Sequence, residues 1–139
     1  MLFASILPDL LGSSDVVKIL IPIFLAILFL QSGLDKVIDW KGNLGWLKGH
    51  FAQSPLKNIV PIMLGTITVF EIVAGLLSAV GAVNILLGNS TELALYGAEL
   101  SALSIIMLFF GQRIAKDYAG AATLVGYFIV CILGILILA

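Results

Sequence analysis

The sequence predicts an all-α fold: a polytopic membrane protein with four transmembrane helices in a compact bundle and a short interfacial helix between the first and second. Of its 139 residues, 61% are hydrophobic and 11% are charged, whereas soluble domains carry roughly 45–50% apolar and about 25% charged residues. Apolar runs also recur at the length of about 20 residues that a helix needs to cross a bilayer. This composition argues against a soluble enzyme and against a disordered regulator.

The expected elements follow from these runs. Residues 1–15 are expected to form an interfacial N-terminal segment and residues 16–139 a membrane domain, with spans at about 16–38, 58–83, 92–112 and 118–139. Because lipid satisfies no backbone polar group, helices are the expected conformation for runs of this length. Pro22 and Pro61 are assigned to first helical turns, where a missing amide costs least.

The connection between the first and second spans is the richest in aromatic and basic residues. Leu44, Leu47 and Phe51 recur at helical spacing, which predicts a short helix lying on the membrane over about 43–54. Aromatic rings and lysines near helix ends favour the headgroup layer. This segment serves either as a docking surface or as a simple anchor. The interfacial or docking candidates are Trp40, Trp46, His50, Phe51, Asp35, Lys36, Arg113 and Asp117.

The distribution of basic residues predicts the topology. The first and third connections, with their flanks, hold six of the seven lysines and arginines, and Lys18 alone lies toward the opposite side. The positive-inside rule places connections 39–57 and 113–117 in the cytoplasm and both termini outside.

Glu71 is the strongest clue to function. It lies near the middle of the second span, where insertion scales assign an ionised carboxylate a cost of about 2.5–3.5 kcal/mol. Gln31, Glu99 and Tyr127 lie inside the other three spans, and we expect the four side chains to form a buried polar cluster. Such a cluster acts either as a proton-carrying or quinone site or as interhelical hydrogen bonds that fix the packing.

Other chemistry is restricted by what the chain lacks. The formal net charge is −1 and no basic block occurs, so we expect no nucleic-acid partner. The single cysteine, Cys131, and the single histidine exclude an intramolecular disulfide and a multi-histidine metal site. We expect no metal and no catalytic constellation, which favours a protein without enzymatic activity of its own.

Three stretches carry a resemblance to a known family: QSGLDK at 31–36, EIVAGLL at 71–77 and GQRIAKDYAGAA at 111–122. Together they resemble the DoxX family of small four-helix membrane proteins, which includes subunits linked to thiosulfate:quinone oxidoreduction and others found with oxidative-stress complexes. The resemblance implies a protein of the bacterial inner membrane that assists a redox or envelope complex, with a quinone or a lipid as candidate ligand. The bundle is also distantly similar to vitamin K epoxide reductase, but this chain lacks the cysteine pairs on which that chemistry depends.

Three functions follow as hypotheses. The first is an auxiliary subunit of a larger inner-membrane assembly, redox- or quinone-linked, with Glu71 as the central acid. The second is a small proton-relay or quinone-site protein with a direct function, and the third is a minimal transporter or lipid-handling protein. The expected partners are membrane lipid and either a larger inner-membrane protein or further copies of this chain.

Overall fold

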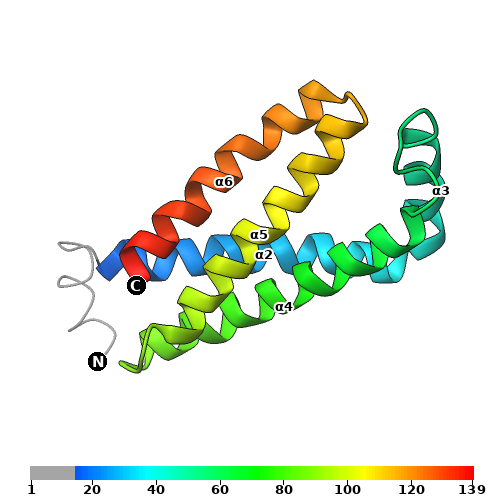
Figure 1. The fold of residues 1–139 in the computed structure, drawn as a ribbon. Coiled ribbons are helices and arrows are strands. Elements are labelled where there is room, and N and C mark those ends of the chain that lie inside the picture. Colours follow the sequence, from blue (N-terminus) through cyan, green and yellow to red (C-terminus); the bar gives the residue numbers. More distant parts are fainter. Residues whose placement is uncertain (1–14) are drawn as a thin grey trace.

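The computed structural model describes residues 15–139, and these residues form helices joined by short connections, without a strand among them. The helices are α2 (Asp15–Ile38), α3 (Trp40–His50), α4 (Val60–Leu86), α5 (Glu92–Ile114) and α6 (Tyr118–Leu138) (Figure 1). The interfacial segment predicted over residues 1–15 lies outside the described residues, apart from Asp15, which begins α2.

Four of the helices, α2, α4, α5 and α6, are long and apolar enough to cross a membrane. Large apolar side chains also cover their outward faces, for example Ile62 at 70% and Leu136 at 72% exposure; such extensive apolar surface suits lipid surroundings. The chain is therefore a small multi-pass membrane protein, and the predicted fold class is confirmed. The four predicted spans agree with the helices to within three residues at each end.

The long helices pack in the order α2, α4, α5, α6, and no Cα atoms of α4 and α6 come within 8 Å of each other. In Figure 1, α5 and α6 run alongside each other at an angle to α2. Small residues set the contact between α4 and α5. A Cβ atom on Gly97 would lie 2.5 Å from Ser78 Oγ, and one on Gly81 would meet the backbone of Ala94.

Helix α3 is the predicted interfacial helix, although it lies a few residues earlier than expected. It begins at Trp40 rather than near residue 43 because Asp39 caps its first turn, accepting a hydrogen bond from the Gly42 amide at 3.2 Å. Asp is among the preferred residues at this capping position. The helix ends at His50, and a turn follows in which Ser54 Oγ donates to the Phe51 carbonyl at 2.9 Å.

Of the two prolines predicted to lie in first helical turns, one does so and the other does not. Pro61 lies at the start of α4, as predicted. The prediction for Pro22 is wrong: Pro22 lies inside α2 and is buried, because the helix begins at Asp15 and residue 22 falls about two turns into it. In this position its ring leaves one helical carbonyl without an amide donor.

The connection through α3 and the connection between α5 and α6 lie at the same end of the bundle. His50 Nε2, at the end of α3, is 2.7 Å from Gln112 Oε1 near the end of α5. At the opposite end, Thr91 Oγ1 donates to the Leu138 carbonyl at 3.0 Å, joining the start of α5 to the end of α6. This arrangement agrees with four antiparallel crossings.

Candidate functional site

Two glycines allow α2 and α4 to approach closely. A Cβ atom on Gly33 would lie 2.7 Å from Ile72 Cγ1 and 3.2 Å from the Ile72 amide nitrogen. One on Gly75 would lie 2.7 Å from Leu30 Cγ. Neither contact tolerates a larger residue without a shift of the helices, because the crowded atoms include backbone. The consequence is that side chains from α2 and α4 meet in the interior beside this crossing.

The central feature at this crossing is an ion pair between Lys36 and Glu71. Lys36 Nζ lies 2.9 Å from Glu71 Oε1, and the two side chains are 16% and 1% exposed. The nitrogen approaches Oε1 outside hydrogen-bonding directions, since this oxygen has a charged neighbour but no aligned donor among the described residues. Lys36 Nζ also donates to Ser32 Oγ at 2.8 Å. Glu71 is therefore buried, as predicted, and its charge is balanced by a lysine one helix away.

The polar residue next to this pair on α4 donates no hydrogen bond to Glu71. Thr68 lies one turn before it and is buried, but its hydroxyl donates to the Leu64 carbonyl at 2.6 Å. A buried pair is stable only while both partners are present, because removal of one leaves an uncompensated charge. The burial of a charged Glu71 therefore depends on the presence of Lys36.

Lys36 also lines a cavity of about 510 Å³. The cavity lies between α3, α4 and α5, and most of its walls are apolar, with contributions from Phe51, Ile67 and Phe110. Its polar side chains are few: Lys36, His50, Thr66 and Gln112. A cavity of this size, mostly apolar and with a small number of polar groups, is typical of a site for a small molecule.

His50 joins α3 to the turn between α5 and α6 at one side of this cavity. Its Nε2 lies 2.7 Å from Gln112 Oε1 and 3.6 Å from Asp117 Oδ2. Its ring stacks on Trp46 with centroids 4.5 Å apart. Asp117 also caps α6, accepting a hydrogen bond from the Gly120 amide at 2.8 Å. Because no Cα atoms of α3 and α5 lie within 8 Å of each other, the contacts between α3 and this part of the bundle are made by side chains.

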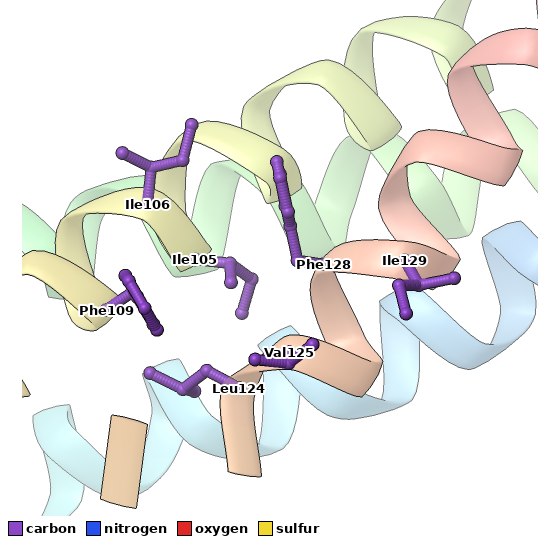
Figure 2. A pocket seen from close by; sticks show the side chains of 7 residues that line it. All are labelled: Ile105, Ile106, Phe109, Leu124, Val125, Phe128 and Ile129. Carbon is purple, nitrogen blue, oxygen red and sulfur yellow. The ribbon is translucent and has the colours of Figure 1, made fainter. Parts of the chain in front are cut away.

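A second hollow lies between α5 and α6 and has a volume of about 220 Å³. Figure 2 shows its seven lining side chains, all of them apolar, including Phe109 and Phe128. The hollow offers no hydrogen-bonding side chain to a ligand. It is a gap between two helices, whereas the larger cavity has polar side chains in its lining.

The predicted buried cluster of four polar residues does not form. Gln31 and Glu99 are exposed, and Tyr127 is half-buried, with its ring 6.3 Å from that of Phe24. Gln31 and Glu99 lie on the sides of α2 and α5 opposite their buried residues. Tyr127 is on α6, which has no Cα atom within 8 Å of a Cα atom of α4. Of the four, Glu71 is the buried member, and its partner is Lys36.

The interfacial candidates at the end of α2 separate into two environments. Asp35 is exposed, as expected of an interfacial charge. Lys36, expected to be a snorkelling or paired charge near the helix end, is paired, and its ammonium turns inward to Glu71. The Cα–Cβ bond of a helical residue tilts toward the helix N-terminus, so a lysine near the end of α2 reaches back into the bundle.

The candidates around α3 differ in exposure as well. Trp46 is 61% exposed and Trp40 is half-buried, so both side chains reach the protein surface. Phe51 is 7% exposed, with ring atom Cζ 3.5 Å from the Cβ position of Gly111; it is a packing residue, so its assignment to a docking surface is wrong. Arg113 lies over the Tyr118 ring, 4.4 Å from its centroid, a cation–π contact.

Sequence reasoning missed three parts of this site: the inward direction of Lys36, the role of Ser32, and the bond between His50 and Gln112. A signal for the first two was present, since Ser32 and Lys36 are four residues apart and share one helix face. Nothing in the sequence pairs His50 with Gln112. Among the described residues, no group of three metal-ligating side chains gathers.

Comparisons with models of known protein families, with curated proteins and with solved structures found no match to this chain. The account of its function therefore stands on the geometry described above.

Proposed function

We propose that this protein is a membrane-embedded binding protein that holds one amphiphilic small molecule, a quinone or a lipid, in the cavity between α3, α4 and α5. One observation carries the proposal: Lys36, which forms a buried ion pair with Glu71, lines an otherwise largely apolar cavity. Ionisable residues within spans are expensive and by default mark a function. Here the pair offers a polar contact to the head of a molecule whose tail lies among the apolar side chains.

The position of the cavity supports entry from the membrane. Several of its lining side chains are exposed on the outer face of the bundle, among them Ile62 at 70%, Ile106 at 50% and Phe110 at 58%. The outer face of the spanning helices is the side on which acyl chains would lie. A molecule dissolved in the bilayer would reach Lys36 without first crossing water.

The same geometry argues against a proton relay along the earlier expected cluster. A relay needs successive proton carriers within hydrogen-bonding reach. Glu99 lies on the outer face of α5, and Tyr127 is on α6, which has no Cα atom within 8 Å of a Cα atom of α4. Glu71 therefore has Lys36 as its ionisable neighbour, an arrangement that suits recognition of a ligand better than transfer of a proton.

The test is native mass spectrometry of the protein released from a mild detergent. We expect the wild-type chain to retain one small amphiphile. Met107, half-buried at the cavity wall, provides the blocking variant Met107→Trp, which should release that molecule. The matched control is Ala122→Trp on the exposed side of α6, which should retain it. A wild-type chain without a bound molecule, or equal retention by Met107→Trp, would contradict the proposal.

A second candidate function, an auxiliary subunit of a larger membrane assembly, is favoured by a separate observation. Gln31 and Glu99 are exposed within spans, where lipid satisfies neither side chain. A partner helix with hydrogen-bond donors would satisfy both. The resemblance to DoxX proteins supports this candidate, together with a bacterial inner-membrane location. The excess of lysine and arginine around connections 39–57 and 113–117 supports a cytoplasmic position for both.

This second candidate has its own test. Purification at native expression in mild detergent should recover a larger membrane protein with the wild-type chain. Glu99→Leu should lose that protein while it retains the bound amphiphile, since Glu99 does not line the cavity. Recovery of the chain alone, or of the same partner with Glu99→Leu, would remove the support for an auxiliary role.

A further inference from the structure

The charges of Lys36 and Glu71 beside the cavity indicate which kind of ligand head the cavity would bind. Lys36 lines the cavity, whereas Glu71 does not line it and is 1% exposed. Lys36 thus lines the cavity with the counter-charge of its ammonium already in place, 2.9 Å from that group. Together the two side chains carry no net charge, and Lys36 brings the N–H donors of its ammonium to this side of the cavity.

Gln112, which also lines the cavity, offers a further donor. With Gln112 Oε1 facing His50 Nε2 at 2.7 Å, the Gln112 amide nitrogen has no hydrogen-bonding partner among residues 15–139. Lys36 directs one N–H to Ser32 Oγ and faces Glu71 Oε1, and its remaining contact, to the Ser32 carbonyl, is long at 3.4 Å. A ligand head that accepts hydrogen bonds is therefore complementary to the site.

We infer that the cavity selects amphiphiles with an uncharged head that carries a carbonyl oxygen, in preference to anionic amphiphiles of the same chain length. The inference rests on the proposed function. A neutral carbonyl accepts a bond from Lys36 and leaves the charge of the site at zero. An anionic head would place two negative charges around one ammonium in a region of low dielectric, where an uncompensated charge is strongly disfavoured.

The experiment compares two probes that differ in the head alone: 2-octadecanone, a ketone, and hexadecanesulfonate, whose head stays ionised. Each competes with a diazirine-bearing long-chain ketone for photolabelling of the cavity, read out by mass spectrometry of the α4 and α5 peptides. For the wild-type chain we expect the ketone to compete at a concentration at least about tenfold below that of the sulfonate, which corresponds to an at least tenfold higher affinity.

Charge variants test the cause of this selectivity. Glu71→Gln leaves Lys36 unbalanced and should shift the preference at least about tenfold toward the sulfonate. The double variant Lys36→Gln/Glu71→Gln restores neutrality and should again prefer the ketone. Glu99→Gln removes a carboxylate on the outer face of α5 and should keep the wild-type ratio. If the ion pair served packing alone, these variants would not shift the preference between the ketone and the sulfonate.

The outcomes separate this inference from the proposal on which it rests. Equal competition by the sulfonate in the wild-type chain would overturn the inference, even if every variant failed to fold. An unchanged ratio in Glu71→Gln would overturn it as well. Labelling of the cavity with either of these results would leave the proposed binding function standing. Absence of any competed label in the cavity would overturn the binding function itself, and the selectivity with it.

Discussion

The contact between Lys36 and Glu71 makes the stability of the bundle depend on both residues. The variant Lys36→Met removes the ammonium and leaves the Glu71 carboxylate, 1% exposed, without its counter-charge. Breaking a buried pair in this way typically costs about 3–5 kcal/mol. We therefore expect a loss of about 3 kcal/mol. The assay is reversible unfolding in mixed detergent micelles at pH 7, followed by the loss of helical circular dichroism.

Two further variants show whether charge is the cause. Lys36→Met/Glu71→Leu should recover most of the stability, since replacement of both partners of a buried pair by apolar residues is often neutral or stabilising. Lys57→Met removes an exposed lysine and should match wild type. A Lys36→Met variant whose free energy of unfolding lies within about 0.5 kcal/mol of wild type would refute the reasoning.

Three further predictions concern packing and access. Gly33→Ala should destabilise the bundle by about 1–3 kcal/mol in the same unfolding assay, because its Cβ would crowd Ile72. Gly126→Ala should leave the stability unchanged, because its Cβ would meet nothing within 4 Å. Equal effects of the two variants would contradict the close α2–α4 crossing. Cys131, fully buried, should react with a membrane-permeant maleimide only on unfolding, and rapid labelling of the folded chain would be inconsistent with the core. His50→Ala should loosen α3 while leaving the four spans intact, seen as faster hydrogen exchange over residues 40–56 alone; unchanged exchange there would show that His50 does not hold α3.

The fold was predictable because bilayer thickness sets the length of each apolar run. The same environment obscured which side chains face inward. In a soluble helix, an apolar face marks the core, but here the outward faces are also apolar, as in the exposed Ile27 and Leu34 beside Gln31. Helix rotation was therefore not readable from the sequence, and Gln31 and Glu99 were wrongly expected to point inward.

The site was predictable in part. The depth of Glu71 in a long apolar run was enough to identify it as a buried acid that needs a partner. Its partner depends on the crossing of α2 and α4 at Gly33, a tertiary contact that no local pattern specifies. The cavity depends on where α3 lies, and α3 is held through His50, 62 residues away from Gln112 in the sequence. Long-range contacts of this kind leave no periodic signal.

The distance between the Lys36 ammonium and the Glu71 carboxyl group is the measurement that bears most directly on both the stability and the ligand class argued above. Solid-state NMR of protein in lipid bilayers, with ¹⁵N-labelled lysine and ¹³C-labelled glutamate, measures it through their dipolar coupling. The account predicts a strong coupling, that of two groups in direct contact, which disappears in Glu71→Gln labelled in the same way. A Lys36 signal without coupling to any glutamate carboxyl carbon would contradict it.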